Sequence, residues 1–299
     1  MKDAGDQVVS KSEHRAVRAP RICVLDSGVG GLTILAAMRA VIPSADWIYC
    51  CDNANFPYGP KSAEQVTDAV HRASAALVRR YVPDIFVVAC NTASTVALPH
   101  LRADFPVPVI GVVPAIKPAA AATRTKTIGL LATPGTVTRP YVLQLIRDFA
   151  PDCNVLLQGS TQLVHLAEAK AHGKALDLSQ IAAEVAPLFQ QSPPQGDPRC
   201  LDTIVLGCTH FPLLQGEIRA VSPWPVTFIE SGPAVAARAK TVLDGLRIGV
   251  GDLASHHGEA SGSKKGDIAV VTRADSESRL LEPLFLRYGF SRSEELVFT

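Results

Sequence analysis

Two cysteines in the sequence stand in matching polar surroundings. They lie 118 positions apart, in the segments Cys90-Asn91-Thr92 and Cys208-Thr209-His210, and each follows a short apolar run typical of a buried strand. Backbone N–H groups at the start of a helix favour a negative charge and lower the pKa of a thiol. We therefore expect Cys90 and Cys208 to act as thiolates near neutral pH, whereas most free cysteines behave as small buried hydrophobes.

Two thiols that face each other across a substrate would suit the inversion of a carbon centre. Racemisation needs one base to remove a proton and an acid on the opposite face to return one, each within hydrogen-bond reach of the reacting carbon. Two equivalent groups that exchange roles allow the reaction to run in both directions. A cysteine hydrolase, with Cys90 or Cys208 as nucleophile and His210 as base, is a second possibility, although that chemistry needs only one cysteine.

The pattern of apolar residues predicts the elements that hold these cysteines. Short β-branched runs alternate with longer Ala- and Leu-rich stretches, which indicates βα units and a mainly parallel sheet with helices on both faces. Polar residues gather where the expected strands end, and ligands bind at these ends in open parallel sheets. The expected strands are 21–25, 46–51, 85–89, 109–113, 127–131, 154–157 and 203–206, and the expected helices are 33–41, 63–80, 140–149, 179–189 and 234–246.

The same order of elements occurs twice along the chain. This repetition predicts two pseudo-symmetric, doubly wound α/β domains with mainly parallel sheets and an active site in the cleft between them. A chance likeness of two ordinary α/β halves is the alternative. The Gly-, Ser- and Lys-rich stretch 251–266 should be a mobile loop. We expect residues 1–20 to be a disordered extension, residues 21–115 plus 228–299 to form the first domain, and residues 116–227 to form the second.

Composition narrows the class of protein. The 299 residues carry Lys+Arg 29 against Asp+Glu 28, a formal net charge of +1, which argues against a nucleic-acid-binding surface. The apolar runs are too short to span a bilayer, and the first 20 residues lack the apolar stretch of a signal peptide, so we expect a cytoplasmic protein that is independent of membranes. The seven cysteines are odd in number and should be reduced.

Neither a cofactor nor a metal ion is expected. The segment Gly28-Val29-Gly30-Gly31 is like a dinucleotide-binding loop but lacks the Gly-x-Gly-x-x-Gly register. His256-His257 has no second ligand cluster at metal spacing, and the sequence singles out no lysine for pyridoxal phosphate. Taken alone, Asp26 could simply cap a helix, and His210 could be a strand-end or core histidine.

Four segments together resemble those of the glutamate racemases, which belong to the cofactor-independent aspartate/glutamate racemase family. They are 24–32 (VLDSGVGGL), 55–59 (NFPYG), 89–94 (ACNTAS) and 206–213 (LGCTHFPL). Their order and spacing fit the family as well, and the resemblance runs from about residue 22 to the C-terminus. It implies an isomerase that interconverts L- and D-glutamate without a cofactor and supplies D-glutamate for peptidoglycan, and so for cell-wall biogenesis and cell shape.

The resemblance also implies roles for individual residues. Cys90 should act on the D-isomer and Cys208 on the L-isomer, with Asp26 and His210 assisting the thiols. Glu168 matches a further assisting glutamate, in a helix after the second strand of the second domain, although Ser160-Thr161 stands just before it where Cys-Pro is common. Neutral groups, without an arginine, should hold the substrate's amino and carboxylate groups: Ser27, Tyr58, Gly59, Asn91, Thr92 and Thr209.

Partners and alternatives follow from the same resemblance. A homodimer is expected. Some members of the family bind DNA gyrase, and the polar extension before Arg21 resembles that of members activated by a peptidoglycan precursor. A racemase of the same fold that acts on aspartate or a hydantoin is an alternative, although Pro57-Tyr58-Gly59 and Cys208-Thr209-His210 favour glutamate. A non-catalytic binding protein is the remaining class.

Overall fold

Two parallel β-sheets carry the polar strand ends. The structure, a computed structural model, describes residues 18–246 and 266–298. The strands in these residues are β1 (Arg21–Asp26), β2 (Asp46–Cys51), β3 (Ile85–Val88), β4 (Val109–Gly111), β5 (Thr127–Ala132), β6 (Asn154–Gly159), β7 (Thr203–Leu206), β8 (Thr227–Ile229), β9 (Ile268–Val271) and β10 (Arg292–Glu295). The first sheet has the order β10-β9-β2-β1-β3-β4 and the second β6-β5-β7-β8, and all the pairs of neighbouring strands are parallel. The predicted α/β class with mainly parallel sheets is confirmed.

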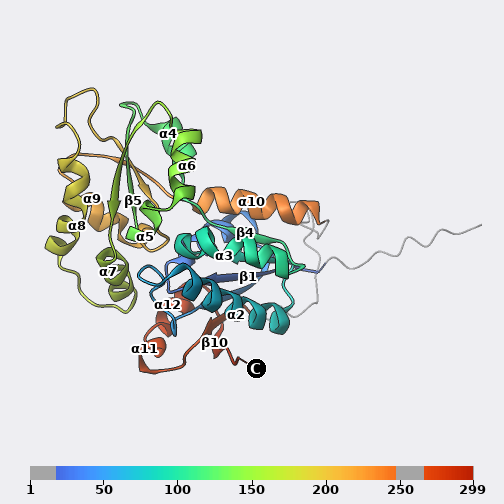
Figure 1. Ribbon diagram of the computed structural model, residues 1–299. Coiled ribbons are helices and arrows are strands. Elements are labelled where there is room, and N and C mark those ends of the chain that lie inside the picture. The colour runs from blue at the N-terminus through green and yellow to red at the C-terminus, as the bar shows by residue number, and fades with distance from the viewer. Residues whose placement is uncertain (1–17, 247–265, 299) are drawn as a thin grey trace, which may run out of the picture.

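Helices connect successive strands and cover the sheets. They are α1 (Gly31–Val41), α2 (Ala63–Tyr81), α3 (Asn91–Asp104), α4 (Ile116–Ala122), α5 (Pro134–Val137), α6 (Pro140–Phe149), α7 (Gln162–Ala171), α8 (Leu178–Gln190), the 3₁₀-helix η1 (Phe211–Leu214), α9 (Gln215–Val221), α10 (Gly232–Gly245), α11 (Ser276–Arg279) and α12 (Glu282–Arg287). Figure 1 shows the second sheet in one lobe with α4, α6, α8 and α9, and the first sheet in the other with α2, α3 and α10.

The buried strands of the first sheet present apolar side chains to both faces. Along β1, Ile22 and Val24 pack on one side with α1 and α10, whereas Cys23 and Leu25 pack on the other with α2 and α3. Such two-sided burial is typical of parallel sheets, in which the crossover helices cover both faces. The strands are therefore held rigidly, and the residues at their carboxyl ends have fixed positions.

The second sheet is built in the same way. Leu131 and Leu206 belong to an apolar cluster with α7 and α8, and Leu130 and Val205 belong to a cluster with α4 and α6. In β1 the neighbour of Asp26 is Cys51 of β2, and in β5 the neighbour of Leu131 is Leu206 of β7. Each sheet thus brings the polar ends of its adjacent strands to one edge.

The sheets can be compared with the predicted domain limits. Strands β9 and β10 return to the first sheet after the second sheet is complete, as a first domain of 21–115 plus 228–299 would require. Strand β8 extends to Ile229, so the expected limit at 227 falls inside a strand of the second sheet. The division into two domains remains a prediction.

Other expectations concern the ends and loops. Arg18, within the expected extension, forms an ion pair of 2.5 Å with Asp84. Residues 1–17 and nearly all of the stretch 251–266, including His256-His257, lie outside the described residues. In the part of the chain that is described, no helix is long and apolar enough to cross a membrane. All seven cysteines lie in the described parts, and they are free thiols.

Candidate active site

The two cysteines occupy equivalent positions in the two sheets. Cys90 directly precedes α3, two residues after β3, and Cys208 lies two residues after β7. Both are buried, with 7% of each residue exposed. The charge on Cys208 contributes to raising the pKa of Cys90, so the two thiols are near enough to interact electrostatically. The expected helix start directly follows Cys90, whereas after Cys208 a turn leads into the 3₁₀-helix η1.

The expectation of a lowered thiol pKa is wrong for Cys90. Burial and the negative charge of Asp26 raise the pKa of Cys90 well above its ordinary value, and the backbone N–H of Ala93 offsets only part of this effect. Desolvation and a nearby like charge both disfavour a thiolate, and together they exceed the effect of a helix start. These surroundings therefore favour the neutral thiol of Cys90 over the thiolate.

Asp26 lies at the end of β1 and is fully buried. It accepts hydrogen bonds from the backbone N–H groups of Ser27, at 2.6 Å, and of Gly31, the first residue of α1. It also accepts one from the hydroxyl of Thr209 at 3.3 Å, which comes from the second sheet's side of the site. Burial raises the pKa of Asp26, although the charge of His210 and these N–H groups lower it in part. Asp26 thus stabilises the start of a helix and also lies beside the Cys90 thiol.

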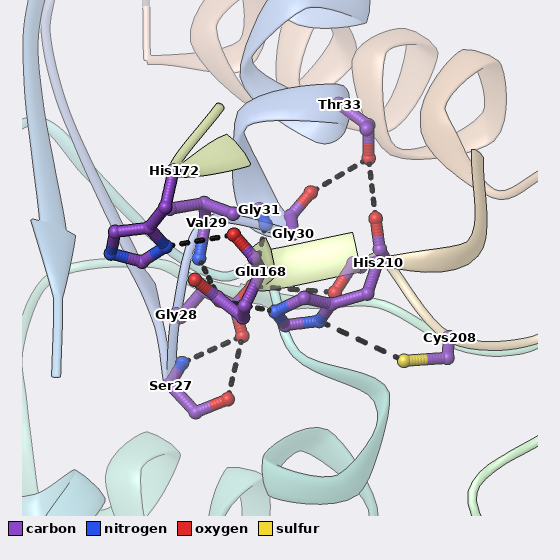
Figure 2. A network of polar contacts seen from close by, with 12 residues as sticks. Ser27, Gly28, Val29, Gly30, Gly31, Thr33, Glu168, His172, Cys208 and His210 are labelled. Atoms are coloured by element: carbon purple, nitrogen blue, oxygen red, sulfur yellow. Dashed lines mark hydrogen bonds and ion pairs between the residues drawn. The ribbon is translucent and has the colours of Figure 1, made fainter. Parts of the chain in front are cut away.

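His210 joins Cys208 to Glu168 (Figure 2). Its Nδ1 lies 3.9 Å from Sγ of Cys208, and its Nε2 lies 2.7 Å from Oε1 of Glu168, on α7. Burial lowers the pKa of His210, but the hydrogen bonds and charges of Cys208 and Glu168 outweigh it and raise that pKa well above 6.5. The structure therefore brings together Cys208 and two residues that the resemblance implies as assisting groups, His210 and Glu168.

The candidate substrate residues surround the two thiols. The Oδ1 atom of Asn91 is buried and has no hydrogen-bond partner, so it can accept a bond from a substrate ammonium group. The hydroxyl of Thr92 lies 3.3 Å from that of Thr133. Tyr58 donates a hydrogen bond of 2.5 Å to the buried carboxylate of Asp52, and this bond holds the loop that contains Gly59. In the described part of the chain, the side chains of Tyr58 and Thr92 bond to Asp52 and Thr133, and neither bonds to an arginine.

Comparison with known proteins decides the family. The family model described as Asp/Glu/Hydantoin racemase matches residues 33–239. A glutamate racemase from Klebsiella pneumoniae is 44% identical over 278 residues, which cover 93% of this chain and 92% of that protein. One from Pasteurella multocida is 48% identical over 229 residues, covering 77% and 82%. This chain belongs to the Asp/Glu/hydantoin racemase family.

A solved structure agrees with this family membership. The structure of Escherichia coli glutamate racemase in complex with L-glutamate and the activator UDP-MurNAc-ala superimposes with a TM-score of 0.83 at 40% sequence identity. The match covers 94% of this chain and 99% of that one. The fold is therefore that of a racemase of this family along almost the whole chain.

Two threonines of this racemase site escaped the sequence analysis. Thr133 follows β5, and its hydroxyl lies 2.9 Å from that of Thr136, at the start of α5; both residues are buried. With Thr92 they form a row of hydroxyl groups that joins the two lobes. The repeated order of the halves could have found them, because β5 corresponds to β1 and the end of β1 carries Asp26-Ser27.

Glu168 also borders a cavity of about 340 Å³, together with Ser27, Gly28 and His165. This cavity offers a route between the Glu168 carboxylate and solvent. No group of three or more His, Cys, Asp or Glu residues in the described ranges could hold a metal ion.

Proposed function

We propose that the protein is a glutamate racemase that interconverts L- and D-glutamate by two-thiol acid/base catalysis. The observation that carries the proposal is the equivalent placement of Cys90 and Cys208, one at each sheet, buried and electrostatically coupled, each with an acid/base partner of its own. The relatives that match most of the chain are named glutamate racemases, which supports glutamate as the substrate.

In the proposed reaction each thiol takes one role in each direction. With D-glutamate, the Cys90 thiolate removes the α-proton, and the Cys208 thiol returns a proton to the opposite face to give L-glutamate. The reverse reaction begins with the Cys208 thiolate. His210, held by Glu168, would assist the Cys208 side, and Asp26 would assist the Cys90 side. General acid–base catalysis requires this matching of pKa values and geometry.

Substrate binding would rest on neutral groups. Asn91 would accept a hydrogen bond from the ammonium group through its unpaired Oδ1. Hydroxyl and backbone N–H groups would bind the two carboxylates. An arginine would bind them more strongly, but it would stabilise the bound substrate as much as the transition state and would not speed the reaction. The remaining residues proposed for this task are Ser27, Tyr58, Gly59, Thr92 and Thr209.

The wider role is also a proposal. We place the active site in a cleft between two domains, in a cytoplasmic enzyme that provides D-glutamate for peptidoglycan. The Escherichia coli structure contains the activator UDP-MurNAc-ala, and we propose that a peptidoglycan precursor of this kind activates the present enzyme too. Racemisation measured with and without UDP-MurNAc-ala would test this; equal rates would contradict it.

A substrate panel tests the proposed function. Purified enzyme should cause loss of optical activity with L- and D-glutamate. The rate should be at least about 100-fold lower with aspartate and with a substituted hydantoin, because a site built for two carboxylates at one spacing binds substrates with another spacing poorly. Preference for aspartate or the hydantoin would assign a different racemase of the same family. A covalent acyl-enzyme at Cys90 or Cys208, trapped and found by mass spectrometry, would instead identify a hydrolase.

A further inference from the structure

The Gly-rich segment after β1 meets the Cys208 side of the site at Gly28. A Cβ atom built on Gly28 would lie 2.0 Å from Oε1 of Glu168 and 2.9 Å from Nε2 of His210. Distances below 3.0 Å do not occur between real Cβ atoms and their neighbours, so any side chain at this position would displace the carboxylate. Gly28 and Glu168 belong to different lobes of the molecule, and Figure 2 shows them side by side.

Position 28 requires a glycine because there is no room for a side chain, and not because of its backbone conformation. Gly28 is not among the residues with a positive φ, which in the described parts of the chain include Gly173 and Gly289. Alanine could therefore adopt the same backbone without strain, because only positive φ values strongly favour glycine. What alanine could not do is leave room for the Glu168 carboxylate.

The same approach lets the first lobe bind Glu168 directly. The backbone N–H of Val29, the next residue, donates a hydrogen bond of 2.8 Å to Oε1 of Glu168, the same oxygen that lies 2.7 Å from His210. The carbonyl of Gly28 is itself fixed by a hydrogen bond of 2.6 Å from the buried hydroxyl of Tyr49. The hydrogen bond from Tyr49 therefore fixes this segment, and the N–H group of Val29 binds the Glu168 side chain of the other lobe.

We propose that Gly28 is a positioning residue for the Cys208 half of the reaction, because its lack of a side chain lets Glu168 sit on the Val29 N–H and hold His210 against Cys208. This inference rests on the proposed racemase function and goes beyond it, since it gives the Gly-rich segment a task in the reaction. The contact between the two lobes places Glu168, and only one of the two thiols depends on it.

The Gly28→Ala variant should disturb the Cys208 side selectively. The atom that the new Cβ meets most closely is the far end of the flexible Glu168 side chain, which can turn away without moving the backbone. At Gly30 the corresponding Cβ would lie 2.7 Å from the backbone nitrogen of His210, so Gly30→Ala would shift the chain itself and is a poorer probe. Gly216, on α9, has no atom within 4 Å of its Cβ position and serves as the matched control.

A half-reaction is needed to distinguish the two faces. L- and D-glutamate have equal free energies, so kcat/KM for racemisation must change equally in both directions. Elimination from 3-chloroglutamate avoids this constraint: a thiolate removes the α-proton, chloride leaves, and water hydrolyses the resulting enamine to 2-oxoglutarate and ammonium. The L-configured compound reports on Cys208 and the D-configured compound on Cys90.

The test is a double-substitution cycle with Gly28→Ala and Glu168→Ala. Each single variant should lower elimination from the L-configured compound by roughly 100-fold, the cost expected of a small misplacement of a catalytic group, and leave the D-configured reaction close to that of the parent and of Gly216→Ala. In the Glu168→Ala background, Gly28→Ala should have little further effect, because the group it displaces is already absent. Equal losses for both hands, or effects that simply multiply, would overturn the proposal.

Denaturant unfolding of the same four proteins tests the contact without relying on activity. The free-energy cost of Gly28→Ala should be smaller in the Glu168→Ala background than in the parent, and equal costs would contradict the Gly28–Glu168 contact. If the parent racemises no glutamate, the proposed function fails, while this cycle still decides whether Gly28 and Glu168 are coupled.

Discussion

The hydroxyl of Thr209 donates a hydrogen bond of 3.3 Å to the buried carboxylate of Asp26, 183 positions away in the sequence. Thr209 follows Cys208, and Asp26 lies beside Cys90, so this bond connects the surroundings of one thiol with those of the other. Thr33, near the start of α1, donates a second bond across the site to the backbone carbonyl of Thr209 at 3.1 Å. The two halves of the site are therefore assembled against each other.

Asp26→Asn should lower the pKa of Cys90. Burial and the charge of Asp26 raise that pKa, and the amide removes the charge while it keeps one hydrogen-bond acceptor. The Cys90 thiolate should then form at lower pH. Alkylation of Cys90 by iodoacetamide, followed across pH by mass spectrometry of the modified peptide, should show its midpoint move to lower pH than in the parent. An unchanged midpoint would mean that Asp26 is neutral in the parent.

Asn91→Ala should weaken substrate binding. The Oδ1 atom of Asn91 is buried and unpaired, so the substrate supplies its hydrogen-bond partner. Loss of one hydrogen bond to a charged group costs about 1.5–3 kcal/mol, which corresponds to an increase in KM of roughly 10- to 100-fold. Initial-rate kinetics with D-glutamate would measure it, with Asn154→Ala at the exposed start of β6 as control. An unchanged KM would exclude Asn91 from the ammonium site.

Glu168→Gln should destabilise the protein in a pH-dependent way. The pKa of His210 is raised in the folded protein, so its protonation stabilises the fold fully below its unfolded value near 6.5, and this stabilisation is lost as the pH rises through the folded pKa. The variant lacks the charged partner and should be less stable by about 1.5–3 kcal/mol at pH 6. Urea unfolding should show a smaller difference at pH 9. A difference that grows with pH would contradict the ion pair.

Cys90→Ser and Cys208→Ser should retain one-sided chemistry of opposite hands. A serine hydroxyl has a shape similar to the thiol but ionises far above neutral pH, so it cannot remove the α-proton. The intact cysteine of each variant can still start elimination from a β-substituted glutamate. Cys90→Ser should then consume the L-configured 3-chloroglutamate and Cys208→Ser the D-configured one. If both variants prefer the same hand, the thiols do not lie on opposite faces of the substrate.

The sequence was sufficient for the fold, and it predicts polar residues near the strand ends, because both depend on local patterns. Strands β3 and β7 lie inside the expected strands, Asp26 ends β1, and Asn91 and Thr209 each lie three residues after a strand. The resemblance of whole segments then identified Glu168, whose position next to His210 depends on how two distant elements pack.

The rest could not be predicted because it depends on solvation and on contacts between lobes. The raised pKa of Cys90 follows from burial beside a charge, which outweighs the helix start that the sequence indicates. Only the repeated order of the halves points to Thr133 and Thr136, and the contact of Thr133 with Thr92 depends on how the two lobes pack. The resemblance includes the Gly28 segment, but the sequence does not indicate its contact with Glu168, which is 140 positions away.

Racemisation of L- and D-glutamate in deuterated water by the parent, Cys90→Ala and Cys208→Ala tests the two-thiol mechanism most directly. Circular dichroism would follow inversion, and NMR would follow deuterium at the α-carbon. The parent should invert both enantiomers and deliver product that carries one solvent deuterium. Each alanine variant should lose racemisation in both directions by at least about 1,000-fold, because inversion needs an acid/base group on each face. Racemisation at close to the parent rate by either alanine variant would contradict the mechanism.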